Sequence, residues 1–161
     1  KALEQFFWHD FCDNYLEIIK DRIYNENKRG RSSKESAQFV LYTTLLAILK
    51  LTASIMPHIT EEIYQSYFAK IEKKKSIHIS DWPKSGIINK KIEKDGDLAI
   101  EIITKVRQFK TNEKKSLKEP VKITIEKKIK KQLTHFLEDL KAIVNATEIE
   151  FGDKFEIELL K

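Results

Sequence analysis

Apolar residues recur with helical spacing along the first half of the chain. Over residues 3–24 they fall at i, i+3, i+4 and i+7, the pattern of a helix that packs on one face. The stripe comprises Trp8, Phe11, Cys12, Tyr15 and Ile19. Residues 37–56 are apolar on nearly every side, and Thr60 followed by two glutamates predicts the N-cap of a further helix. The pattern therefore predicts a helical bundle over residues 1–83.

The pattern changes in the second half of the chain. Residues 84–96 are polar and predict a linker, and helical spacing returns over residues 97–110. From Val121 onward apolar and charged residues alternate as in a half-buried strand, and an amphipathic helix is expected over residues 132–143 before the alternation resumes. We predict a mainly α fold, in which the helical bundle is followed by a small α+β subdomain over residues 97–161.

Both tryptophans are expected to be shielded from solvent. Trp8 lies on the apolar stripe of the first helix, and Trp82 stands in an Asp-Trp-Pro turn that would anchor the chain to the bundle. Cys12 shares the aromatic stripe, so we expect a buried, inert thiol rather than a nucleophile.

The composition excludes several classes of protein. Hydrophobic residues make up 41% of the chain, which is too many for a disordered protein, and 4 Gly and 3 Pro are too few for a turn-rich β sandwich. One cysteine excludes an internal disulfide and indicates a reducing compartment, so we expect a cytoplasmic monomer without a membrane span. The chain begins at Lys1 without an initiator Met or signal peptide, and we interpret it as a piece of a longer protein.

The net charge of +5 is unevenly distributed. Residues 105–131 contain 11 basic and three acidic residues. Two interpretations are open: a solubilising, lysine-rich surface, or a flank that faces a polyanion, for which we expect RNA.

Catalytic chemistry finds no support in the sequence. Four scattered glycines cannot build a phosphate-binding loop, and the histidines and acids lack the spacing of a zinc site. We predict no catalytic residues, no metal and no cofactor in this chain.

RNA contacts have better candidates. Single-stranded RNA is held by aromatic faces and by cations, and residues 25–36 form a polar, basic segment that predicts a loop. Lys28 belongs to this segment. The candidate contacts are Tyr24, Arg29, Arg31, Lys34, Arg107 and Lys110.

Several segments resemble valyl-tRNA synthetases. Residues 6–20 (FFWHDFCDNYLEIIK) are similar to the F-x-W-x-x-F-C-D-x-Y-L-E helix of that family. Residues 51–64 (LTASIMPHITEEIY) resemble its T-E-E-I segment, which isoleucyl and leucyl relatives share, and residues 76–83 (SIHISDWP) resemble the S-I-H-x-x-x-W-P segment of the archaeal/eukaryotic-like branch. Residues 100–117 and 137–151 are similar to the later helix and closing α+β unit.

The resemblance implies an anticodon-binding domain of a class I aminoacyl-tRNA synthetase. Such a domain positions tRNA, here valine-specific tRNA, for aminoacylation with ATP and Mg by a catalytic domain absent from this chain. The HIGH and KMSKS motifs of that domain do not occur here, and neither does the K-L-W-N segment that precedes the F-x-W helix. The implied partners are tRNA and the catalytic and editing domains of the parent enzyme. The alternatives are an isoleucyl or leucyl counterpart and a stand-alone helical tRNA-binding adaptor.

Overall fold

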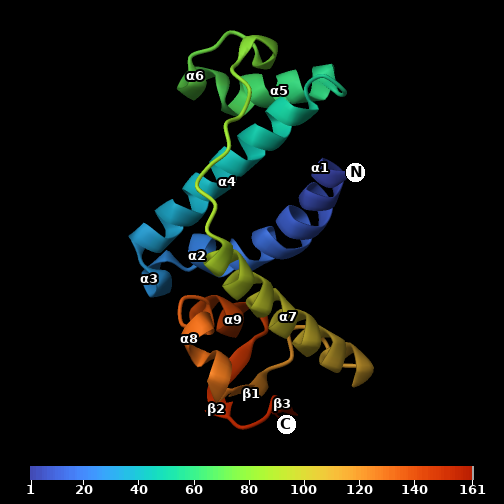
Figure 1. The fold of residues 1–161 in the computed structure, drawn as a ribbon, viewed down its shortest axis with the longest axis vertical. Coiled ribbons are helices and arrows are strands. Elements are labelled where there is room, and N and C mark those ends of the chain that lie inside the picture. The colour runs from blue at the N-terminus through green and yellow to red at the C-terminus, as the bar shows by residue number, and fades with distance from the viewer. Residues whose placement is uncertain (161) are drawn as a thin grey trace.

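The computed structural model describes residues 1–160, which form an elongated molecule (Figure 1). Helices α4–α6 extend toward one end, helices α1–α3 lie in the middle, and a three-stranded sheet with helices α7–α9 occupies the other end. This arrangement confirms the predicted mainly α fold with a small α+β part. None of the helices in this range is both long and apolar enough to cross a membrane.

The first helix is one continuous arm built from three segments. It comprises α1 (Ala2–Gln5), a π-helical segment η1 (Phe6–Tyr15) and α2 (Leu16–Tyr24). The predicted helix over residues 3–24 is therefore confirmed in extent. The π-helical segment was not foreseen, because its wider turn, closed by i→i+5 hydrogen bonds, leaves no distinct mark in apolar spacing.

The arm buries less of its aromatic stripe than the sequence predicts. Phe11 and Ile19 are buried, but Cys12 is only half-buried and Trp8 is 56% exposed. Because a π-helical turn has a different period, residues spaced for an α-helix do not stay on one face. The prediction that Trp8 is shielded is wrong. Trp82 is also exposed, so its predicted anchoring contact is wrong as well.

The predicted loop over residues 25–36 is wrong. The chain instead forms α3 (Glu26–Arg29) and then α4 (Arg31–Thr52), which begins six residues before the helix predicted over residues 37–56. Only Gly30 interrupts the two helices, with φ +80, a conformation that favours glycine. Polar residues are compatible with helix here because their side chains are solvated and can pair with residues one turn away.

The next helix, α5 (Pro57–Tyr67), begins earlier than predicted. Pro57 stands at its first position, where the missing N–H costs no hydrogen bond. Thr60 is buried inside the helix, and its hydroxyl donates to the carbonyl oxygen of Met56 at 2.8 Å. The prediction that Thr60 is the N-cap is therefore wrong. Two short elements, α6 (Ala69–Glu72) and η2 (Ile77–Ile79), follow.

Helix α7 (Lys90–Asn112) starts within the predicted linker. The side chain of Asn89 caps it by accepting hydrogen bonds from the backbone N–H groups of Lys91 and Ile92. The irregular connection is thus confined to residues 81–89, rather than extending over residues 84–96.

The sheet has the strand order β2-β1-β3, with β2 parallel and β3 antiparallel to β1. The predicted alternation in β1 is confirmed, because its apolar side chains are buried and its charged ones are half-buried. The helix predicted over residues 132–143 is divided into two short helices by a turn. The elements are β1 (Val121–Glu126), η3 (Lys127–Ile129), α8 (Lys130–Leu133), α9 (Leu137–Ile143), β2 (Ala146–Gly152) and β3 (Glu156–Leu159).

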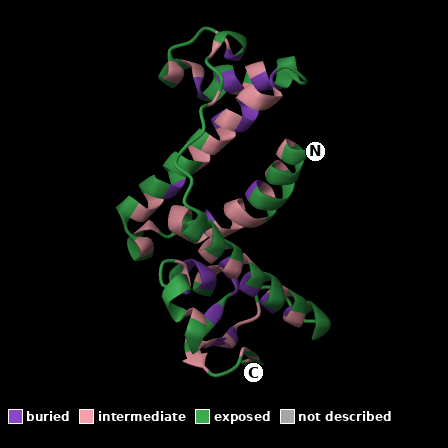
Figure 2. Ribbon diagram, in the orientation of Figure 1, coloured by how far each residue is buried: buried purple, intermediate pink, exposed green. Residues whose placement is uncertain are grey.

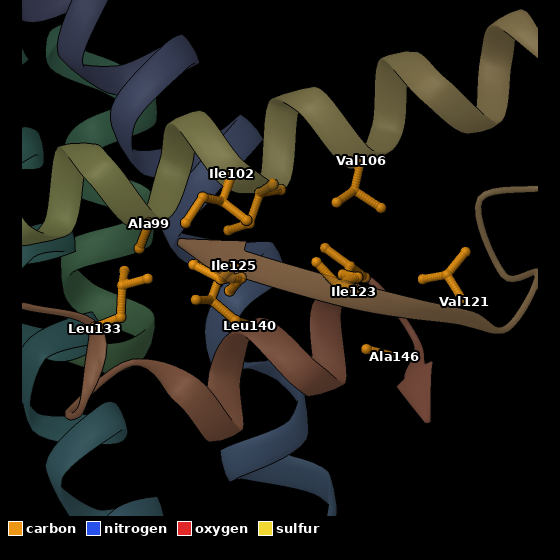
Figure 3. Close-up of a cluster of buried hydrophobic side chains, with 11 residues drawn as sticks. Ala99, Ile102, Val106, Val121, Ile123, Ile125, Leu133, Leu140 and Ala146 are labelled. Carbon is orange, nitrogen blue, oxygen red and sulfur yellow. The ribbon is translucent and has the colours of Figure 1, made fainter. Parts of the chain in front are cut away.

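Two separate hydrophobic cores stabilise the molecule (Figure 2). In the larger core, side chains of β1 lie between α7 and α9 (Figure 3). Its buried members include Ala99, Ile102, Val106, Val121, Ile123, Ile125, Leu133 and Leu140. The smaller core joins α4, α5 and η2 through Leu46, Leu49, Tyr64, Phe68 and Ile77. The inward positions predicted for Ile102 and Val106 are confirmed.

Candidate nucleic-acid interface

Lys110, one of the predicted phosphate contacts, is a core residue. Its side chain is 1% exposed, and its Nζ donates to the carbonyl oxygens of Leu117 at 2.9 Å, Glu119 at 2.6 Å and Val144 at 2.6 Å. Burial lowers the pKa of Lys110, and the charge of Glu119 acts in the opposite direction. With all three donors engaged, the ammonium group cannot reach a phosphate, so Lys110 is removed from the RNA-binding set.

Arg29 is also held inside the protein. Its side chain is 6% exposed, and it pairs with Asp21 at 2.9 Å, Asp139 at 2.6 Å and Glu138 at 3.2 Å. The sequence suggested that Arg29 is a free cation, because its partners Glu138 and Asp139 belong to α9 and lie far away along the chain. Arg29 is therefore engaged in ion pairs within the protein, which oppose the phosphate contact predicted for it.

The carboxylate of Asp139 links α9 to α2 and α3. Asp139 is buried, and it accepts hydrogen bonds from Nε of Arg22 at 2.8 Å and Nη2 of Arg29 at 2.6 Å. A second contact, to Nη2 of Arg22, makes the Arg22 pair bidentate. Because a buried carboxylate requires compensating charge, these contacts tie α2 and α3 to α9.

Arg31 and Lys34 lie on the first turns of α4. Arg31 is exposed and pairs with Glu35 at 2.7 Å, and Lys34 is half-buried and pairs with Glu26 at 2.8 Å. Pairs of this kind contribute little to stability, so both cations can exchange a carboxylate for a phosphate.

Arg107 lies on a different helix from Arg31 and Lys34. It is half-buried on α7, whose C-terminal turns extend away from α3 (Figure 1). The helix that carries Arg107 therefore leads away from α3.

Tyr24, the aromatic member of the predicted set, is exposed. It is the last residue of α2, and 79% of it is accessible. A shallow hollow opens beside it, and we call this the seam hollow because its walls come from α2 and α3 on one side and from α9 and β2 on the other. Its lining comprises Lys20, Asp21, Tyr24, Asn25, Lys28, Lys141, Ala142, Asn145 and Ala146.

The seam hollow has a net positive lining. Lys20, Lys28 and Lys141 are exposed cations, and Asp21 is the one acid among the lining residues. Burial alone would raise the pKa of Asp21, but hydrogen bonds from Asn25 and Arg29 outweigh it and lower that pKa. Asp21 is thus held as a carboxylate by Arg29, which it shares with Asp139 and Glu138, and the three lysines outnumber it in the lining.

Sequence reasoning missed Lys20 and Lys141. Lys20 lies on the polar side of the first helix, one turn before Tyr24, and that spacing could have indicated it. Lys141 reaches the hollow through the packing of α9 against α2, which no local pattern foretells.

Comparison with known proteins gives a consistent result. Residues 1–125 match the family described as the anticodon-binding domain of tRNA ligase. A valine–tRNA ligase of Rickettsia felis is 40% identical over 162 residues, which cover 98% of this chain and 18% of the relative. That of Methanothermobacter thermautotrophicus is 36% identical over 152 residues, covering 91% of this chain and 16% of the relative. The chain spans less than a fifth of these relatives, and it belongs to the anticodon-binding domain family of tRNA ligases.

Proposed function

We propose that this chain is the anticodon-binding part of a longer valine–tRNA ligase, in which it positions tRNA. The observation that carries the proposal is the match of 98% of the chain to a valine–tRNA ligase at 40% identity. In such an enzyme, the catalytic domain uses ATP with Mg to join valine to its tRNA, and an editing domain removes misacylated product. Both domains are partners in the same polypeptide, outside the residues described here.

The affinity for tRNA comes mainly from phosphates. Arg31, Lys34 and Arg107 remain the accessible members of the predicted set, and lysine and arginine on exposed helix faces attract the RNA backbone without reading its sequence. Each phosphate contact on single-stranded RNA contributes about −0.7 to the slope of log affinity against log salt concentration.

The test compares tRNA binding by the full-length ligase with and without these cations. Fluorescence anisotropy with a labelled valine tRNA transcript, repeated at several salt concentrations, should give a steep negative slope. Replacing Arg31 and Arg107 together by Ala should lower affinity and reduce the slope by about 1.4 if each contacts one phosphate. The matched control replaces Lys70 and Lys73, two exposed lysines in and beside α6. An affinity for valine tRNA that does not depend on salt would contradict the proposal.

The proposal also separates binding from catalysis. The isolated chain should support no valine-dependent ATP–pyrophosphate exchange and no aminoacylation, whereas the full-length ligase should charge valine tRNA in preference to isoleucine tRNA. Preferential charging of isoleucine tRNA would identify the parent as the isoleucyl enzyme instead.

A further inference from the structure

We propose that the seam hollow binds one unpaired nucleotide of the tRNA. The base stacks on Tyr24, the adjoining phosphates lie against Lys28 and Lys141, and Asp139 acts as a positioning residue that fixes the two walls. This inference rests on the proposed function, and it names the residues that would make one of the contacts with tRNA.

Tyr24 is suited to stacking because most of its side chain is free of the protein. It ends α2 at the point where Asn25 leaves helical geometry, with φ −111 and ψ 51. A large aromatic side chain that is 79% exposed beside a hollow offers a face to a base, and every base has a π face that such a ring accepts.

Exposure alone does not distinguish Tyr24. Tyr67 on α5 is 73% exposed, yet it does not line the seam hollow or the adjoining depression along α3. That depression is lined by Tyr24, Asn25, Glu26, Asn27, Lys28 and Lys34. Tyr24 thus has a concave surface with lysines on both of its sides, and Tyr67 serves as its natural control.

The lysines approach the hollow from two parts of the chain. Lys28 belongs to α3 and Lys141 to α9, and both are exposed. Lysine suits a phosphate because it is a solvated point charge with three rotatable donors. Asn25 and Asn145 also line the hollow. Their amide nitrogens donate to Oδ1 of Asp21 and to the carbonyl oxygen of Lys118, and their amide oxygens add acceptors of the kind that read base edges.

The ion pair between Arg22 and Asp139 joins α2 to α9, two of the elements that form the walls of the hollow. Arg22, which is bonded to Asp139, lies two residues before Tyr24, and Asp139 lies two residues before Lys141. Tyr24 and Lys141 therefore each follow, by two residues, one partner of the bidentate salt bridge between Arg22 and Asp139. Loss of this pair would separate the two halves of the subsite without removing a group that touches RNA.

The first experiment measures binding of labelled valine tRNA to the full-length ligase. Tyr24→Leu should weaken binding about 5- to 150-fold, the range for loss of one stacked base, with the salt slope unchanged. Tyr24→Phe should bind as the parent does, and Tyr67→Leu should have no effect. Equal effects of Tyr24→Leu and Tyr67→Leu, while the parent binds tRNA well, would overturn the subsite and leave the proposed function intact.

The second experiment tests the cations. Replacing Lys28 and Lys141 together by Ala should reduce the salt slope by about 1.4, two phosphate contacts, whereas the Lys70 and Lys73 control should leave it unchanged. An unchanged slope in the Lys28 and Lys141 variant would contradict the assigned phosphate contacts. Absence of tRNA binding by the parent protein would instead refute the proposed function.

The third experiment isolates the positioning role of Asp139 by a double-mutant cycle. In the Asp139→Asn background, Tyr24→Leu should cause little further loss, because the stacked base has already lost its opposing wall. A purely structural role would leave the effect of Tyr24→Leu undiminished, and that result would refute the positioning role. If Asp139→Asn fails to fold, as judged by circular dichroism, the cycle is repeated with Arg22→Lys, which keeps the charge but loses the bidentate geometry.

Discussion

The sheet end of the molecule and its N-terminal helical arm bury their apolar side chains to very different degrees. At the sheet end, all three apolar residues of β1 are at most 1% exposed and lie between α7 and α9. In the arm, Phe6 and Trp8 are exposed although they belong to an equally apolar stretch of sequence. The difference shows that an apolar pattern specifies a face, whereas burial depends on whether another element lies against that face.

The largest expected effect on stability comes from a substitution in the core of the sheet end. Ile123→Ala, at the centre of β1, should lower the free energy of unfolding by about 2–5 kcal/mol, because it leaves a cavity between two helices. Trp8→Ala removes a larger side chain but should cost less than about 1 kcal/mol, since the indole is mostly in solvent. Urea unfolding of both variants measures the contrast, and a greater loss in Trp8→Ala would contradict it.

A close contact between β1 and β2 provides a second test of tight packing at the sheet end. A Cβ added at Gly152 would lie 2.6 Å from Cγ2 of Thr124, so Gly152→Ala should destabilise by about 1–3 kcal/mol. Thr124→Ser, which removes that methyl group, should restore most of the loss in the double variant. Gly86→Ala is the matched control, because nothing lies within 4 Å of a Cβ added there. Thermal unfolding of the parent, Gly152→Ala, the double variant and Gly86→Ala tests whether Gly152 and Thr124 interact in this way.

At the helical end, the carboxylate of Glu61 fastens η2 to α5. It accepts hydrogen bonds from the Ser76 hydroxyl at 2.8 Å and the Ile77 N–H at 2.9 Å. Burial alone would raise the pKa of Glu61, but these bonds and one from Gln65 outweigh it and lower that pKa.

The resulting stability should depend on pH in one direction. Because the folded pKa of Glu61 is below the unfolded value of 4.5, its contribution is present above that value and is lost as pH falls through the folded pKa. Melting temperatures measured against pH should show the parent above Glu61→Gln at neutral pH, with the gap closing in acid. A gap that stays constant down to low pH would contradict the role of the carboxylate.

The smallest expected effect concerns Tyr64 in the same region. Its hydroxyl is buried and has no hydrogen-bond partner among the described residues. Tyr64→Phe should therefore be neutral or stabilise by about 1 kcal/mol, because it removes an unsatisfied polar atom without opening a cavity. A marked loss of stability on chemical denaturation would show that the hydroxyl is satisfied in solution.

Some elements of the fold could be predicted from the sequence and others could not. The alternation of Val121, Ile123 and Ile125 predicted a half-buried strand, because a period of two is imposed by any sheet with one buried face. The inward face of α7 followed from its spacing in the same way. The start of α7 and the helical character of residues 25–36 were missed, because exposed polar residues are tolerated in helices and loops alike.

The candidate site was harder to predict than the fold. Tyr24 could be singled out because its place at a helix end beside cations is a local feature. Arg29 and Lys110 could not be judged locally, since each has a partner far along the chain, the carboxylate of Asp139 for Arg29 and the carbonyl oxygen of Val144 for Lys110. Long-range packing decides whether a cation faces water or the interior, and a one-dimensional pattern carries no record of that choice.

The bond between Arg29 and Asp139 also constrains how the chain can mature on the ribosome. The two residues are 110 positions apart, so at about 5–20 residues per second Arg29 waits on the order of 5–20 s for its partner to be synthesised. The central strand β1 waits as well, because both of its neighbours, β2 and β3, are translated after it. The helical end can therefore assemble during translation before the sheet does, whereas the sheet and the wall it contributes to the seam hollow form only after β2 and β3 have been synthesised.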